Sequence, residues 1–232
     1  MTPAHFWTFQ NWALLGLNVA AESAVFWLAI SRRFSRRLVM LPIFAGFCLL
    51  FDVAGTVLAL TVSVDAIGSA HLWYSHAYWL FYWAGQCGGA VVLLLLALQV
   101  VTVILPPWDR LIAIIVIVLC LALAVVYYKL LPIQHPRDVL TLLTWASGIT
   151  ILALPIIAVV HPSDWPKGIP LVVSGMVLSL VLQIACAVTA AILKTMVGFV
   201  SVGVPLGALV GMGFFLAALI RIPAVARDSA TA

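Results

Sequence analysis

The sequence predicts an all-α protein, a polytopic transmembrane bundle of seven helices. Of its 232 residues, 66% are hydrophobic and only 8% are charged. Soluble domains carry about 25% charged residues and about 45–50% apolar residues. Polar side chains are therefore too few to cover a water-soluble protein, and the surplus apolar surface must face lipid.

Short polar clusters separate seven apolar segments, each long enough for the roughly 20 residues that cross the hydrocarbon core. We expect helices at residues 8–31, 39–63, 77–104, 108–131, 138–160, 169–193 and 198–221. Barrel strands alternate in hydrophobicity, whereas these segments are apolar on all sides. Backbone groups in lipid must also bond within their own segment. The chain, 1–232, is then a single transmembrane domain.

The first three segments have distinct starts. The first is not expected to be a cleaved signal peptide, because MTPAHFWTFQ has no Lys or Arg and the apolar run contains Asn18 and Glu22. The basic cluster SRRFSRR separates it from the second segment, in which Pro42 suits a first helical turn. Trp and Tyr residues before and at the start of the third segment are typical of a membrane interface.

The fourth, fifth and sixth segments follow proline-rich connections. The fourth has no polar residue between Arg110 and Tyr127 apart from Cys120, so it should be the most lipid-exposed helix. Pro155 in the fifth segment and Pro205 in the seventh predict kinks, because proline removes a helical hydrogen bond.

The distribution of Lys and Arg predicts an outside N-terminus and an inside C-terminus. Eight basic residues would fall inside, namely Arg32, Arg33, Arg36, Arg37, Arg110, Lys167, Arg221 and Arg227, and three outside, namely Lys129, Arg137 and Lys194. Short loops without extramembrane domains suit a bacterial cytoplasmic (inner) membrane. Lipid is the predicted partner, with a homo-oligomer or a larger membrane complex as further options and nucleic acid excluded.

Two carboxylates interrupt the first two segments near mid-membrane. Glu22, the only glutamate, precedes Arg32 by ten residues, or about 15 Å along a helix. Half of a hydrocarbon core measures about 15 Å. Asp52 is similarly central in the second segment, so the two should face each other at similar depth. A charged carboxylate there costs roughly 2.5–3.5 kcal/mol, which protonation, a cation or a water-filled cavity would offset.

Polar side chains on neighbouring segments should line the same interior. Asn18 shares a helix face with Glu22, and Thr56 shares one with Asp52. Tyr82 and Gln86 of the third segment and Gln183 of the sixth should complete this lining, since polar groups avoid lipid. In the seventh segment Gly203, Gly207 and Gly211 are spaced by four, a pattern that lets helices pack closely.

The histidines favour a metal site only weakly. His71, His76 and His135 all map to the predicted outer side. His71 and His76 are five residues apart, whereas two ligands on one helix face are usually four apart. No cofactor is predicted, and a metal or haem redox protein is the minor alternative.

Enzyme activity has no positive signal and is less expected than its absence. The seventh segment lacks a lysine for retinal, and no hydrolase, zincin or P-loop motif occurs. The leading hypothesis is a small-solute or ion transport pathway, coupled or not to protons, in which Glu22 and Asp52 bind the proton or cation. The alternative is a non-catalytic membrane subunit or seven-helix sensor that acts through protein partners.

Overall fold

The computed structural model describes residues 9–31, 38–62, 70–127, 136–160, 165–193 and 196–221. Within these ranges there are seven helices and no strand, so the predicted all-α fold is confirmed. The helices are α1 (Phe9–Ser31), α2 (Met40–Val62), α3 (Ala70–Ile104), α4 (Pro107–Tyr127), α5 (Pro136–Val160), α6 (Ile169–Leu193) and α7 (Met196–Arg221).

The predicted boundaries differ most from the observed ones at α3 and α4. Helix α3 begins at Ala70, seven residues before the expected start at residue 77. The stretch AHLWYSH contains neither Pro nor Gly, so nothing in it stops a helix that the apolar run would continue. Helix α4 ends at Tyr127, and the last predicted residues of that segment lie outside the described ranges.

Helix length and hydropathy identify a multi-pass membrane protein. In the part of the chain that the structure describes, five helices are long and apolar enough to cross a membrane, namely α1, α2, α3, α5 and α6. Helix α7 contributes a shorter apolar stretch, Pro205–Arg221. Which side of the membrane holds the two termini stays a prediction from the basic residues.

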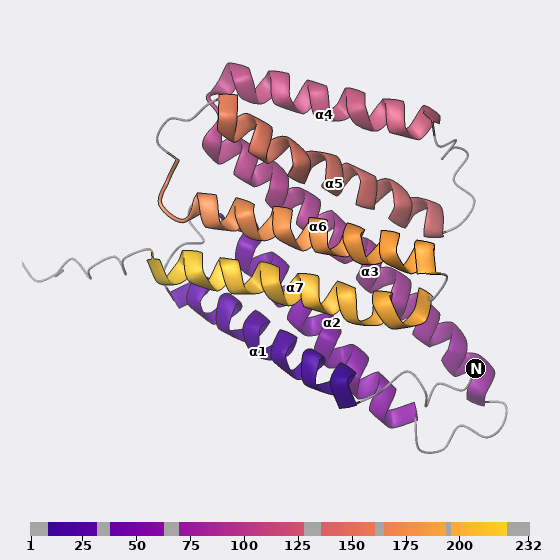
Figure 1. Ribbon diagram of the computed structural model, residues 1–232. Helices are drawn as coiled ribbons and strands as arrows, with labels where there is room; N and C mark the ends of the chain where they lie inside the picture. Colours follow the sequence, from indigo (N-terminus) through magenta and orange to yellow (C-terminus); the bar gives the residue numbers. More distant parts are fainter. Residues whose placement is uncertain are drawn as a thin grey trace, which may run out of the picture.

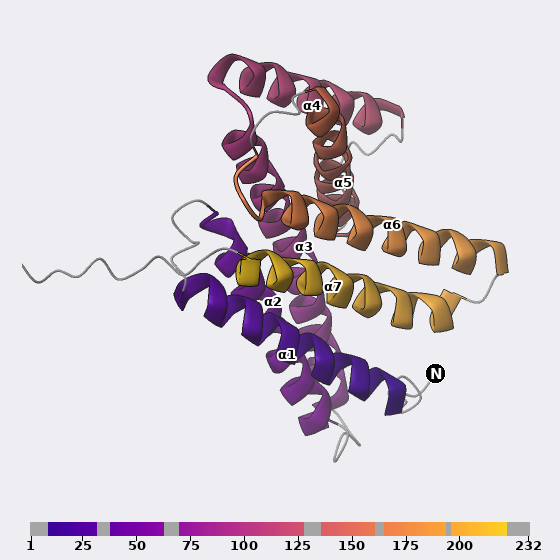
Figure 2. The same ribbon diagram turned by 60° about the vertical axis from the view of Figure 1, so that its left-hand side comes forward.

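Helix α3 connects two groups of helices (Figure 1). One group contains α1, α2, α6 and α7, in which α7 lies between α1 and α6. The other contains α4 and α5, and α3 packs against both α2 and α5. Figure 2 shows α6 and α7 side by side along their length, while α5 crosses α6 and α4 lies away from both. The contact between α5 and α6 is correspondingly slight.

Helix α4 covers the outside of the molecule. It carries nine of the exposed large hydrophobic side chains, more than any other described helix: Trp108, Leu111, Ile112, Ile115, Val116, Val118, Leu119, Leu123 and Val126. Water would penalise such a surface, whereas acyl chains would not. The predicted exposure of this helix is confirmed, and its contact with lipid stays a prediction.

Glycines on α3 receive aromatic rings from α2. A Cβ atom on Gly85 would lie 2.6 Å from the Phe51 ring, and one on Gly88 would overlap the Phe47 ring. The two rings lie with their centroids 4.5 Å apart, and the Phe51 ring also stacks on Phe81. These glycines therefore leave the space on α3 that the phenylalanine rings of α2 occupy.

Helices α6 and α7 approach each other much more closely, backbone to backbone. A Cβ atom on Gly175 would lie 2.7 Å from the Phe214 Cβ and 3.1 Å from the Gly211 carbonyl oxygen. A Cβ atom on Gly207 would lie 3.1 Å from the Ser179 carbonyl oxygen. Small residues permit such contact where no hydrophobic effect drives helices together.

A side chain of α3 satisfies the start of α2. The Gln99 amide oxygen accepts a hydrogen bond from the Met40 backbone N–H at 2.8 Å. The first N–H groups of any helix lack partners within that helix. Gln99 therefore ties α2 to α3 at a position where an unpaired donor would be costly.

We expect Gln99→Leu to lower the free energy of unfolding by about 1–2 kcal/mol, because it leaves the Met40 N–H without its acceptor. Gln86→Leu is the matched control on the same helix, since Gln86 is exposed to the surroundings of the protein. Reversible unfolding in mixed micelles measures both. A loss of equal size in the two variants would contradict a capping role for Gln99.

Candidate functional site

Glu22 is buried in the interior of the helix bundle. Its exposed fraction is 3%, and Asn18, one turn earlier on α1, is 4% exposed. Among the described residues, no hydrogen-bond partner reaches Glu22 Oε2 or Asn18 Oδ1. Two acceptor atoms on adjacent turns are thus buried without a donor. Such atoms are rare in folded proteins and call for a proton, a water molecule or a cation.

The Glu22 side chain borders a cavity of about 100 Å³. Six helices line this cavity, which we call the central cavity. Its lining residues are Glu22, Phe44, Cys48, Leu93, Ile151, Met176, Ser179, Leu180, Gln183, Ala208, Gly211, Met212 and Phe215. A water molecule occupies about 30 Å³ in the liquid, so the space suits about three. Pockets for drug-sized ligands measure roughly 300–1,000 Å³, well above this volume.

One wall of the central cavity is polar. Gln183 donates a hydrogen bond from Nε2 to Ser179 Oγ at 3.3 Å. Both residues belong to the face of α6 that packs on the α7 glycines, where a Gly207 Cβ would lie 3.1 Å from Gln183 Cγ. The small residues of α7 therefore leave room for the polar face of α6 to reach the cavity.

Asp52 lies near Glu22 but does not line the central cavity. Asp52 is half-buried, and the Thr56 hydroxyl donates to its backbone carbonyl at 2.6 Å. Glu22 lies nine residues from Ser31, whereas Asp52 lies twelve residues from Met40. Counted from the α1–α2 connection, Asp52 is therefore three residues, or about 4.5 Å, further along its helix than Glu22.

Asn18 links α1 to α7. Its Nδ2 donates to the Pro205 carbonyl oxygen at 3.2 Å. This bond fixes the side chain so that the amide oxygen stays on the buried side of α1, near Glu22. The pair Asn18 and Glu22 thus forms a polar stripe that faces α7.

The remaining predicted site residues do not join this cluster. Gln86 is exposed on α3, which corrects its predicted inward placement, because the α3 face toward α2 is occupied by glycines and phenylalanine rings. The surroundings of four further predicted residues lie outside the described part of the molecule, and so does all of His135. The four residues are Tyr82, Gly203, His71 and His76. Among the described residues, no three His, Cys, Asp or Glu side chains gather as a metal site.

Some polar residues near the centre were not predicted as part of the site. Cys48 borders the central cavity together with Glu22. Ser179 shares its helix face with Gln183 at a spacing of four, which predicts that both belong to one polar stripe, and it lines the cavity with Gln183. Ser147 and Thr150 of α5 are buried as well, and each hydroxyl donates to a carbonyl of its own helix.

The chain matches no protein-family model, and no curated protein or solved structure shows significant similarity to it. The geometry of the site is therefore the basis for a functional proposal.

Proposed function

We propose that the protein is a pathway for protons or a small monovalent cation across a bacterial cytoplasmic membrane. The observation that carries the proposal is the buried Glu22 side chain, which lines the central cavity and whose Oε2 has no hydrogen-bond partner among the described residues. An ionisable residue within a membrane-spanning helix is a functional candidate by default, because its burial is costly.

Glu22 acts in this proposal as the binding group. A proton on Oε2 would give the buried cluster the donor that it lacks, while the nearby Asn18 Oδ1 is an acceptor without a donor. Water in the central cavity would then exchange the proton with the exterior by way of Ser179 and Gln183. Water molecules that bridge polar groups are nearly as favourable as direct hydrogen bonds.

Asp52 acts in this proposal as the second proton-binding group. It is half-buried and displaced along the bundle from Glu22, so it can meet water that Glu22 does not meet. Repulsion between the two carboxylates favours a state in which one proton is shared or held by only one of them. Transfer of the proton from one to the other would move it along the membrane normal.

The volume of the central cavity limits the size of the transported species. A space of about 100 Å³ holds a proton on a carboxyl, a few water molecules or one small cation. A sugar or a larger solute would require the helices to separate. The alternative, a subunit that binds partners through the α7 glycines, is less favoured because Gly207 and Gly211 already pack on α6.

Purified protein in liposomes provides the test. With an imposed pH gradient and the membrane potential clamped, we expect the internal pH to change faster than in protein-free vesicles, in proportion to the amount of protein. Sodium or potassium gradients at constant pH test the cation option in parallel. Flux equal to that of empty vesicles under all three gradients would contradict the proposal.

A further inference from the structure

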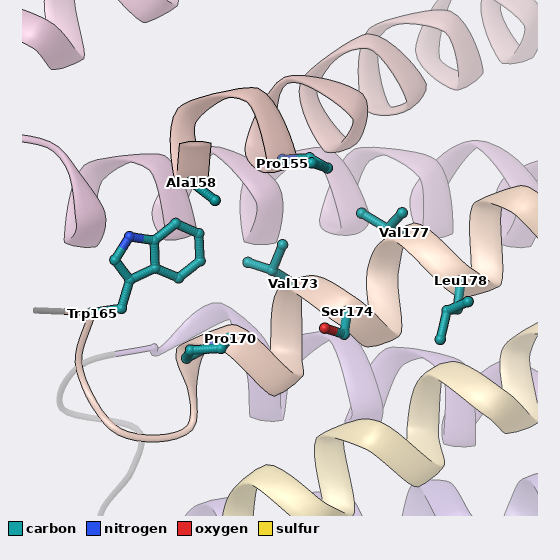
Figure 3. A pocket seen from close by; sticks show the side chains of 8 residues that line it. All are labelled: Pro155, Ala158, Trp165, Pro170, Val173, Ser174, Val177 and Leu178. Atoms are coloured by element: carbon teal, nitrogen blue, oxygen red, sulfur yellow. The ribbon is translucent and has the colours of Figure 1, made fainter. Parts of the chain in front are cut away.

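A second hollow, of about 630 Å³, lies between α5 and α6, away from the central cavity (Figure 3). We call it the lateral groove. Its lining residues are Pro155, Ala158, Trp165, Pro170, Val173, Ser174, Val177 and Leu178. Figure 3 shows Pro155 and Ala158 of α5 facing Val173 and Val177 of α6, with the Trp165 ring at one end. The groove exists because α5 and α6 touch only slightly.

The lateral groove opens toward the surface that meets lipid. Its rim residues Pro170, Ser174 and Leu178 are exposed, and Ile156, beside the groove on α5, is 66% exposed. From Pro170 to Leu178 the groove follows α6 for about 12 Å. The hydrocarbon of one leaflet is about 15 Å deep, so the groove matches the course of one acyl chain through most of a leaflet.

The polar residues of the lateral groove follow the order of groups in a phospholipid. Lys167 is exposed just before α6, and Trp165, a residue type typical of headgroup depth, lies beside it. Ser174 lies five residues into α6, and its neighbours along the groove are apolar. An indole and a hydroxyl thus line the groove among apolar side chains, and a cation lies in the turn between its lining residues Trp165 and Pro170.

The Ser174 hydroxyl lacks the bond to a carbonyl of its own helix that most of the described helical hydroxyls make. Those of Ser23, Thr56, Thr102, Thr144, Thr150 and Thr189 each donate to a backbone carbonyl of their own helix. Ser174 makes no hydrogen bond to any residue that the structure describes, and its side chain is one of those that line the lateral groove. A hydroxyl in an apolar groove is stabilised by an acceptor from a ligand.

We propose that the lateral groove binds one phospholipid with an anionic headgroup. One acyl chain lies between α5 and α6, the Ser174 hydroxyl donates to an ester carbonyl of the glycerol, and Lys167 binds the phosphate. Apolar contact alone does not select a lipid within a bilayer, because an acyl chain is in an equally apolar environment among other acyl chains. Selectivity therefore comes from charge complementarity at Lys167 and from the fit of the chain.

Native mass spectrometry of the full-length protein tests the occupant, after reconstitution in equal amounts of phosphatidylglycerol and phosphatidylcholine. Wild type is expected to retain one phosphatidylglycerol in preference to phosphatidylcholine, and Ala158→Trp, which fills the groove, is expected to lose it. Ile156→Trp is the matched control on α5, since Ile156 does not line the groove. Retention that is equal in wild type and Ala158→Trp would overturn the proposal.

A substitution of Lys167 tests the proposed contact with the lipid headgroup. Lys167→Gln is expected to lower the preference for phosphatidylglycerol about fivefold, the effect of one basic residue near a membrane surface. Arg221→Gln, which removes an exposed charge at the end of α7, should leave the preference unchanged. A dimer of the protein that Ala158→Trp dissociates would assign the groove to a second copy and overturn the proposal.

A measurement on the unmodified protein guards against variants that fail to fold. A phospholipid with a photoreactive acyl chain is expected to label peptides of α5 and α6 that contain Ala158 and Val177 more than peptides of α4. Helix α4 offers the larger exposed apolar surface, so random contact would label it most. Labelling in proportion to exposed surface would also overturn the proposal.

Discussion

Glu22→Gln is expected to lower proton flux through the reconstituted protein by roughly 100-fold or more. The amide keeps the shape and polarity of the side chain but cannot gain or lose a proton at any accessible pH. Loss of a positioned acid–base group commonly costs 10²–10⁴-fold in rate. The comparison is made in liposomes under one imposed pH gradient, with equal amounts of wild type and variant.

The same substitution should leave the fold intact, which separates the loss of flux from a loss of structure. The glutamine amide supplies N–H donors to a region where Asn18 Oδ1 is buried without one among the described residues. The free energy of unfolding should therefore stay the same or rise by about 1 kcal/mol. Glu22 in a charged, well-compensated state would instead make the variant less stable, and that result would contradict the arrangement proposed here.

Two companion variants sharpen the result. Asp52→Asn should reduce flux less than Glu22→Gln, because Asp52 lies beside the central cavity without lining it. Ser23→Ala is the matched control on α1, since its hydroxyl bonds only the Val19 carbonyl of its own helix. Wild-type flux in Glu22→Gln, or equal losses in Glu22→Gln and Ser23→Ala, would refute a role for Glu22 as the binding group.

Gly175→Leu is expected to lower the free energy of unfolding by about 3 kcal/mol. Its Cβ would lie 2.7 Å from the Phe214 Cβ and 3.1 Å from the Gly211 carbonyl oxygen, so α6 and α7 would have to move apart. Overpacking of a close interface typically costs 1–3 kcal/mol, and here backbone atoms block relaxation. Unfolding in mixed micelles, followed by the loss of helical signal, measures the change.

Gly213→Leu is the matched control for that prediction. A Cβ atom on Gly213 would meet nothing within 4 Å, and the residue is exposed on α7. The variant should be unchanged or stabilised by up to about 1 kcal/mol, since leucine favours a helix more than glycine does. Equal destabilisation of the two variants would show that helix content, not the α6–α7 contact, determines the change in the free energy of unfolding.

The helices could be predicted from the sequence because apolar segments of sufficient length leave the backbone one way to satisfy its hydrogen bonds in lipid. Five of the predicted segments end within two residues of the observed helices; α3, which starts at Ala70, and α4, which ends at Tyr127, do not. The early start of α3 could not be predicted, because the segment before residue 77 is aromatic and polar. Helical structure there depends on continuity with the apolar part, which hydropathy does not report.

The placement of the polar residues was only partly predictable. A stripe with a spacing of four identifies a helix face, as for Asn18 with Glu22 and for Ser179 with Gln183. Which neighbour that face meets depends on how the helices are rotated and ordered, and the spacing carries no such information. Gln86 illustrates the difference, since its helix turns glycines toward α2 and leaves the amide exposed.

Helix α3 gives the molecule a sensitivity to bilayer thickness. Its 35 residues extend about 52 Å, while its apolar part, Trp83–Ile104, measures about 33 Å and already exceeds an average hydrocarbon core of about 30 Å. A longer hydrophobic stretch is accommodated by tilting, at a cost of a fraction of a kcal/mol per Å of mismatch. Because α3 packs against both α2 and α5, a change of its tilt in thinner or thicker membranes would reorient the two helix groups relative to each other.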